Sequence, residues 1–200
     1  ILDQDQAPLP LVPNKDQQPL DINIQEEIYG PVLFQGKRFQ RIEQIFSVKS
    51  DDIIGGTIRY ESKYDKDCSD GVLLGDPYLR DSLLQSGQLV IPQDQCLPTR
   101  IEKLYLCPSV SLNRDNVEGY TEIYKSGDKT YLANLYIHDE NGIIREKIEG
   151  YTLTVLERNE SIIKGSELGA RPKQEDTMKD NKDPIIVPYD KVSEMLRLSL

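Results

Sequence analysis

The chain has 200 residues, of which 38% are hydrophobic, and it carries a formal net charge of −10. The length allows one domain with appendages. The acidic charge argues against nucleic-acid binding, because that affinity comes mainly from Lys and Arg that neutralise phosphates. No apolar run approaches the roughly 18–20 residues that span a bilayer, so no membrane partner is expected either. A start at Ile1 rather than Met predicts a fragment or a processed product.

The cysteines are few and lack CxxC spacing: Cys68, Cys96 and Cys107. An odd and sparse set argues against a zinc site or a disulfide scaffold, so no metal is expected. Reduced structural thiols are typical of the cytosol, and a cytoplasmic location is therefore predicted. A nucleophilic cysteine would need a nearby histidine, and the chain has only one.

The two ends of the chain read as linkers. Residues 1–20 are rich in Pro, Gln and Asp and predict an extended linker. Residues 159–200 predict a second, polar linker, whose last part, 189–200, has apolar residues at near-helical spacing. That part is either a short helix that docks elsewhere or the start of a connection to a following domain. One compact domain is expected between the linkers, at 21–158.

The compact region begins with two predicted strands and one strong helix. Strands are expected at 41–48 and 53–61, separated by the turn-prone sequence Ser50-Asp51-Asp52. The helix is expected at 77–90, because Asp76 can cap it and Pro77 fits its first turn. Pro92 and the polar residues 93–95 end it.

Four more strands are expected after the helix, at 100–107, 116–125, 130–137 and 143–157. Asn141-Gly142 predicts a hairpin turn, because both residues accept a positive φ. Gly150 predicts a bulge in the long last strand. Since no βαβ alternation occurs, the class is α+β: an antiparallel β-sheet wrapped around a central α-helix, which is the hotdog fold.

Asp81 and Gln85 form the most informative pair of the chain. Residues i and i+4 share one helix face, and the neighbouring positions include Leu79, Leu83 and Leu84. Desolvation against an apolar wall raises the pKa of a carboxylic acid, so Asp81 could donate a proton near neutral pH. The alternative is a surface carboxylate beside an ordinary helix glutamine.

Two segments together resemble the dehydratase domains of polyketide synthases. Tyr29-Gly30-Pro31-Val-Leu-Phe34-Gln resembles the tyrosine-glycine-proline-phenylalanine-glutamine segment that opens the second hotdog of those domains. The run from Asp76-Pro77 to Asp81 and Gln85 resembles their helix motif, usually histidine-proline followed by Asp-x-x-x-Gln or Asp-x-x-x-His. The order of the two motifs also matches, and the resemblance covers about two thirds of the chain.

The resemblance implies a site shared by two hotdogs of one polypeptide. In that family the first hotdog supplies a histidine base and the second supplies the aspartic acid. They dehydrate a β-hydroxyacyl chain carried on the phosphopantetheine of an acyl carrier protein, without a metal or redox cofactor. Carried over to this chain, Asp81 is the general acid and Gln85 its partner. Tyr29, Gly30, Pro31 and Phe34 would lie along the tunnel for the acyl and pantetheine arm.

The chain departs from that family pattern in two ways. Asp76 stands where the family often has histidine, and the first hotdog with its His-x-x-x-Gly-x-x-x-x-Pro motif is missing. The only histidine, His138, lacks the following Gly and Pro and is predicted as an exposed turn residue. The chain is therefore expected to be the C-terminal hotdog half, inactive alone. Its expected partners are an acyl carrier protein, the N-terminal hotdog half that supplies the histidine, and other synthase domains, with a homodimer as a further option.

Other functions fit the same predicted fold. A product-template domain that guides aldol cyclisation, or a double-bond isomerase, would share the scaffold and differ in its product. A non-catalytic hotdog would serve as a structural or carrier-docking module. A homodimeric hotdog, such as a thioesterase, is a further alternative, which the Tyr29-Gly30-Pro31 segment disfavours.

Overall fold

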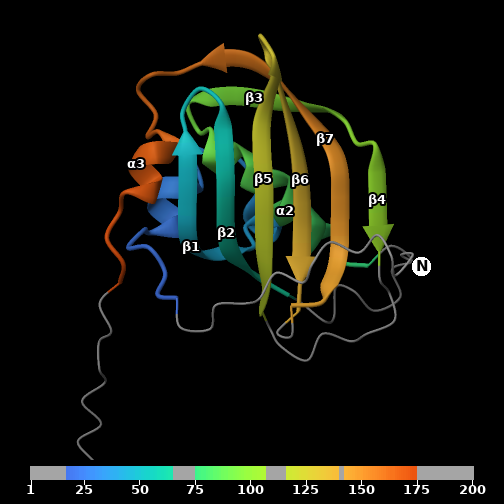
Figure 1. The fold of residues 1–200 in the computed structure, drawn as a ribbon. Helices are drawn as coiled ribbons and strands as arrows, with labels where there is room; N and C mark the ends of the chain where they lie inside the picture. The colour runs from blue at the N-terminus through green and yellow to red at the C-terminus, as the bar shows by residue number, and fades with distance from the viewer. Residues whose placement is uncertain (1–16, 65–74, 107–115, 140–141, 175–200) are drawn as a thin grey trace, which may run out of the picture.

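The computed structural model describes residues 17–64, 75–106, 116–139 and 142–174, and the statements below concern these residues (Figure 1). They form one antiparallel sheet in the order β1-β2-β5-β6-β7-β3, with β4 also paired to β7. The strands are β1 (Ile42–Asp51), β2 (Gly55–Lys63), β3 (Asp94–Arg100), β4 (Lys103–Leu106), β5 (Asn116–Gly127), β6 (Thr130–His138) and β7 (Ile144–Arg158).

The helix α2 (Pro77–Val90) lies against one face of this curved sheet, as Figure 1 shows behind β5 and β6. The side chain of Asp76 caps it by accepting hydrogen bonds from the backbone N–H groups of Tyr78 and Leu79, at 2.8 and 3.2 Å. Such a cap satisfies donors that have no partner inside the helix. Leu83 and Leu89 are fully buried against the sheet. The predicted helix and the predicted hotdog architecture are both confirmed.

Small side chains let α2 approach the sheet closely. The hydroxyl groups of Ser82 and Ser62 lie 2.9 Å apart, and those of Ser86 and Thr121 lie 2.5 Å apart. On β5, Gly119 leaves space for the buried ring of Tyr60, because a Cβ at position 119 would lie 2.1 Å from the Cζ atom of that ring. Small serine and threonine side chains therefore line the contact between helix and sheet, and Gly119 makes room for a large ring on the neighbouring strand.

This close contact predicts the cost of one added methyl group. Gly119→Ala should lower the free energy of unfolding by about 1–3 kcal/mol, because a packed core accommodates extra atoms only by strain. Urea unfolding followed by circular dichroism measures this. Gly36→Ala is the matched control, since its φ is −66° and a Cβ added there would meet no atom within 4 Å. Equal stability of the two variants would contradict the packing argument.

Segments from both ends of the described chain pack along β1. The backbone N–H of Leu20 donates to the carbonyl of Ile45 at 2.7 Å, and Leu20 forms a β-bridge with Lys173. The short helix α3 (Gly165–Gly169) buries Leu168 beside β1, at the left of Figure 1. The packed body thus includes 17–20 and 159–174, parts of the predicted linkers. Residues 1–16 and the predicted tail segment 189–200 lie outside the described residues.

The largest difference from the predicted strands lies after α2. Residues 93–95 were expected only to end the helix and one strand was expected at 100–107, but β3 and β4 are two separate strands, Asp94–Arg100 and Lys103–Leu106. A proline inside a run argues against a central strand, whereas a strand at the sheet edge tolerates it. Pro98 lies in β3, the last strand of the sheet order. The proline made the segment look unlike a strand, and its place at the sheet edge is what allows a strand there.

The expected irregularities of the β6–β7 hairpin are partly visible. Gly150 has a φ of 65°, and the β6–β7 register shifts between Ala133 and Leu135, so the predicted bulge is confirmed. Gly142 has a φ of 78°, whereas Asn141 of the predicted turn lies outside the described residues.

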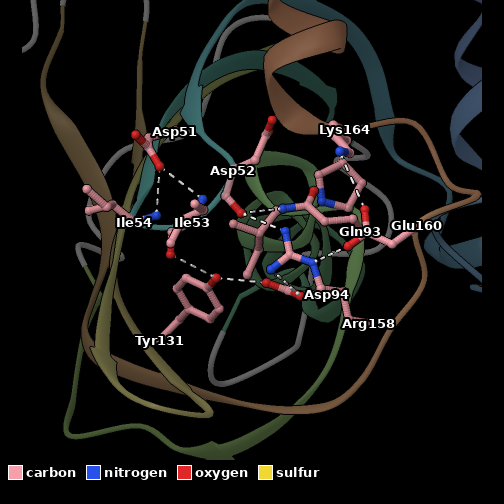
Figure 2. Close-up of polar contacts among 12 residues, drawn as sticks. Asp51, Asp52, Ile53, Ile54, Gln93, Asp94, Tyr131, Arg158, Glu160 and Lys164 are labelled. Atoms are coloured by element: carbon pink, nitrogen blue, oxygen red, sulfur yellow. Dashed lines mark hydrogen bonds and ion pairs between the residues drawn. The ribbon is translucent and has the colours of Figure 1, made fainter.

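A polar network holds the end of α2 and the start of β3 in place (Figure 2). The Tyr131 hydroxyl donates to Asp94 Oδ2 at 2.8 Å, and Arg158 Nη1 lies 3.8 Å from Asp94 Oδ1. Arg158 and Gln93 both donate to the carbonyl of Asp52, at 3.2 and 2.9 Å. The network links β3, β6, β7 and the β1–β2 hairpin. It therefore fixes the direction in which β3 starts after the end of α2.

Candidate active site

A cavity of about 290 Å³ lies beside α2. Its walls come from α2, β3, β7 and the segment that follows the Tyr-Gly-Pro turn. Among the described residues, most of the lining side chains are apolar, and Asp81 is the only one of them that carries a formal charge. The lining residues are Val32, Leu33, Phe34, Gln35, Asp81, Leu84, Gln85, Gln88, Gln95, Cys96, Leu97, Pro98, Tyr151, Leu153 and Leu156.

Asp81 and Gln85 both reach this cavity from one face of α2. The side-chain amide of Gln85 donates one hydrogen bond to Asp81 Oδ2 at 2.5 Å and another to the backbone carbonyl of Phe39 at 2.9 Å. The i,i+4 spacing brings a carboxyl group and a carboxamide into direct contact.

The setting of Asp81 favours its neutral form. Partial burial raises the pKa of this carboxyl group, and the hydrogen bond from Gln85 lowers it by a smaller amount, so the net direction is upward. Tyr151, on the same wall, has its own pKa raised by burial and by the nearby charge of Asp81, and it stays protonated. A carboxylic acid with a raised pKa can donate a proton to a leaving group at a pH where an ordinary aspartate is ionised.

Tyr29 lies behind this pair. Its hydroxyl donates to Gln85 Oε1 at 3.2 Å and accepts from the backbone N–H of Ile42 at 3.0 Å. The ring is buried, and Tyr29 is not among the residues that line the cavity. A tunnel residue was predicted here, and the structure places it one hydrogen bond away from the cavity wall.

Of the other predicted tunnel residues, those in the turn lie outside the cavity and the one after it lines the cavity. Gly30 and Pro31 are exposed and do not line the cavity. The φ of Gly30 is 108°, which favours glycine, and its N–H donates to the carbonyl of Leu33 at 2.6 Å. The chain then reverses and brings Phe34 to the cavity mouth, with 87% of the residue exposed. The structure therefore brings Phe34, Asp81 and Gln85 together at one cavity.

The prediction that His138 is an exposed turn residue is wrong. It is the last residue of β6, pairs with Glu118 of β5 and is only 1% exposed. Burial lowers the pKa of its imidazole, although the nearby Glu118 acts in the opposite direction. A register shift between Ile137 and His138 accompanies this inward placement. His138 does not line the cavity, so the only imidazole of the chain is not one of the groups that share this cavity with Asp81.

Several residues of the cavity were missed from sequence, and Gln88 and Cys96 show why. Gln88 donates to the backbone carbonyl of Asp94 at 2.6 Å and accepts from the N–H of Cys96 at 3.3 Å, which fixes β3 to α2. Gln88 lies seven positions after Asp81, a spacing that shares the helix face, and that signal could have found it. Cys96 was missed because β3 was not predicted. Burial raises the pKa of its thiol to about 12, so it is a neutral wall residue.

No helix in the described ranges is long and apolar enough to cross a membrane. Within those same ranges, no three histidine, cysteine, aspartate or glutamate residues are grouped so that they could hold a metal ion.

Three dehydratase domains are among the solved structures that the chain resembles. The dehydratase domain from the CurF module of the curacin polyketide synthase is 20% identical, with a TM-score of 0.55, over 76% of this chain and 54% of that one. The dehydratase domain from the CurJ module is 22% identical, with a TM-score of 0.47, over 64% and 45% of the two chains. The dehydratase domain of RzxB from Pseudomonas fluorescens is 17% identical, with a TM-score of 0.47, over 60% and 42%. The chain thus spans about half the length of these dehydratase structures.

Comparison with protein families gives the affiliation. The family described as "Polyketide synthase dehydratase N-terminal domain" matches residues 6–162, most of the chain. This description leaves the predicted placement as a C-terminal half unconfirmed. No match was found among curated proteins. The matched length, together with the fold shared with the CurF domain, shows that the chain belongs to the polyketide synthase dehydratase family.

Proposed function

We propose that this chain forms the acid half of a dehydratase site. The site would eliminate water from a β-hydroxyacyl thioester carried on the phosphopantetheine of an acyl carrier protein. The observation that carries the proposal is Asp81, the one charged residue among the described residues that line a mostly apolar cavity, with a raised pKa and a hydrogen bond from Gln85. The family affiliation supports the same chemistry. The cytoplasmic location stays a prediction.

The reaction needs a base as well as this acid. A base removes the proton from the α-carbon, and the electron pair left behind forms the α,β double bond. The bond between the β-carbon and its oxygen then breaks, and the departing hydroxyl takes the proton of Asp81 and leaves as water. Elimination of this kind consumes no redox cofactor, and general acid–base groups supply its proton transfers.

No residue of the described cavity wall fits the role of that base. His138 is buried elsewhere, and the thiol of Cys96 is held neutral by its raised pKa. We therefore propose that a second hotdog supplies a histidine and that this chain is the C-terminal, acid-bearing half. The N-terminal half would lie in the same polypeptide or on another chain, and further synthase domains would deliver the carrier.

The edge of the sheet at β3 and β4 is the proposed docking edge for that second hotdog. At the opposite edge, terminal segments already cover β1. Around β3, Leu97 is 48% exposed, Leu156 is 61% exposed and Phe34 protrudes. All three residues also line the cavity. An exposed apolar patch of this kind marks an interaction site, and a partner seated on it would close the cavity that Asp81 lines.

Product analysis tests the function. The protein with both hotdogs is incubated with a β-hydroxyacyl carrier protein, and the carrier-bound product is identified by mass spectrometry. The expected product has lost one water and contains an α,β double bond. Two parallel incubations test the alternatives: an enoyl carrier substrate whose double bond shifts without water loss would identify an isomerase, and a polyketone carrier substrate that is cyclised would identify a product-template domain, in each case with the β-hydroxyacyl substrate left unchanged. An unchanged substrate would identify a structural or carrier-docking hotdog, and any of these results would overturn the proposal.

A further inference from the structure

Tyr29 lies outside the cavity, yet it is joined to Asp81 through a single side chain. The hydroxyl of Tyr29 bonds Gln85 Oε1, and Gln85 Nε2 bonds Asp81 Oδ2. We propose that Tyr29 is a positioning residue that fixes the orientation of the Gln85 amide and so leaves the acidic proton of Asp81 on Oδ1. The hydrogen-bond geometry of Tyr29, Gln85 and Asp81 involves no substrate. Only the statement that this geometry serves catalysis rests on the proposed function.

Two backbone groups give this chain of hydrogen bonds one direction. The N–H of Ile42 can only donate, and it donates to the oxygen of Tyr29, which leaves the proton of that hydroxyl for Gln85 Oε1. The carbonyl of Phe39 can only accept, so it requires the NH₂ side of the Gln85 amide. A flipped amide would place Oε1 against the Phe39 carbonyl oxygen and against Asp81. The observed orientation is therefore the one that satisfies all of these groups.

The consequence for Asp81 follows from donor and acceptor counting. A carboxyl oxygen that accepts a hydrogen bond from an amide does not hold the acidic proton in the same direction. Oδ2 is that oxygen, at 2.5 Å from Gln85 Nε2. Within the described residues no hydrogen bond reaches Oδ1, and Asp81 lines the cavity. The proton to be donated is thus carried on the oxygen that remains available to a ligand.

The Tyr29 hydroxyl remains a hydrogen-bond donor at every pH at which Asp81 changes its protonation. Its side chain is buried, and burial raises the pKa of its hydroxyl to about 12. The hydroxyl stays protonated across the pH range in which Asp81 titrates, so the direction of the hydrogen bonds is the same for both forms of the acid. This constancy separates Tyr29 from a residue that would itself exchange protons during the reaction.

The test is a titration that needs no substrate. The full chain is labelled with ¹³C at aspartate carboxyl groups, and the Asp81 signal is assigned by its loss in Asp81→Asn. Tyr29→Phe should shift the pKa of Asp81 upward, because the Gln85 amide is then held only by the Phe39 carbonyl and can present its oxygen instead of its N–H to the carboxylate for part of the time. Tyr131→Phe is the matched control: it also removes a buried tyrosine hydroxyl, one that donates to Asp94 rather than to Gln85, and it should leave the pKa of Asp81 unchanged.

A double-mutant cycle shows whether Tyr29 acts through Gln85. Gln85→Met should raise the pKa of Asp81 by itself, and Tyr29→Phe added to Gln85→Met should raise it no further. An additive shift, or no shift in Tyr29→Phe, would overturn the proposal. If Tyr29→Phe does not fold, the wild-type protein decides: the Gln85 NH₂ protons should show nuclear Overhauser contacts to Phe39 rather than to the Tyr29 hydroxyl.

The outcome is independent of the proposed function. If the protein fails to dehydrate any β-hydroxyacyl substrate but shows the Tyr29-dependent shift in the pKa of Asp81, the positioning role of Tyr29 stands and the proposed dehydration is rejected. If the protein dehydrates normally but shows no such shift, the proposed dehydration stands and the positioning role of Tyr29 is rejected.

Discussion

Asp81→Asn should lower the dehydration rate of the protein with both hotdogs by about 10²–10⁴-fold, the usual contribution of a general acid. Asn keeps the shape of the side chain and still offers an oxygen to the Gln85 amide, but it cannot release a proton to the leaving hydroxyl. The measurement is kcat and kcat/KM for a β-hydroxyacyl carrier substrate. Equal losses in both constants are expected, because the proton transfer occurs only in the transition state.

The same variant should not lose stability at neutral pH. The folded-state pKa of Asp81 is raised by burial, so its neutral form is the better accommodated one. For an acid shifted in this direction, the free energy of unfolding falls as the pH rises from the unfolded-state pKa through the folded-state pKa. Asn removes this loss, and the variant should be as stable as the wild type or more stable above that pH range.

Asp51→Asn provides the matched control for this experiment. Asp51 Oδ1 caps the β1–β2 turn by accepting from the backbone N–H groups of Ile53 and Ile54, both at 3.0 Å. Asn can replace this cap, and the turn does not line the cavity. The control should therefore retain its activity. Near-wild-type turnover by Asp81→Asn would remove Asp81 from the role of general acid.

The isolated 200-residue chain should show no dehydration above background, and addition of a hotdog that bears the histidine base should restore it. The physical reason is that the described cavity wall offers the proposed acid, Asp81, but no group suited to act as the base, and an elimination that lacks its base loses about 10²–10⁴-fold from that cause alone. The measurement is product formation against the concentration of the added half, which should saturate as the complex forms. Full activity of the isolated chain would contradict the split site.

Substitutions at the docking edge sharpen this complementation experiment. Leu97→Asp places a charge in the apolar patch beside the cavity and should weaken binding of the added hotdog half. A higher concentration of that half should then be needed to restore dehydration. Ile143→Asp is its control, because Ile143 is similarly exposed, at 50%, in the β6–β7 turn. Equal complementation by the two variants would place the partner on another surface.

Much of the helix could be predicted from local sequence. The cap Asp76, the first-turn Pro77 and the i,i+4 spacing of Asp81 and Gln85 depend on rules that act within a few residues. These rules placed the pair on one face, and the structure brings both members to the cavity. The catalytic role of the pair stays a prediction, because position alone does not show proton transfer.

The missed features depend on contacts between distant segments. β3 carries Pro98 and is read from sequence as a loop, and only its pairing with β7 reveals a strand. His138 adjoins a predicted turn, but the register at the end of β6 buries it. Tyr29 was expected in the tunnel because of its motif. Its contact with Gln85 spans 56 positions and no local pattern indicates it.

The bridge between Leu20 and Lys173 has a consequence for how such a body can be joined to others. The N–H of Gln174 also donates to the carbonyl of Pro19 at 2.9 Å, so the first and last described residues of the packed body lie side by side. Neighbouring ends of this kind are the condition under which domain insertion and circular permutation are tolerated. The body could therefore be inserted as a cassette into a surface loop of another protein without forcing the flanking strands of its host apart.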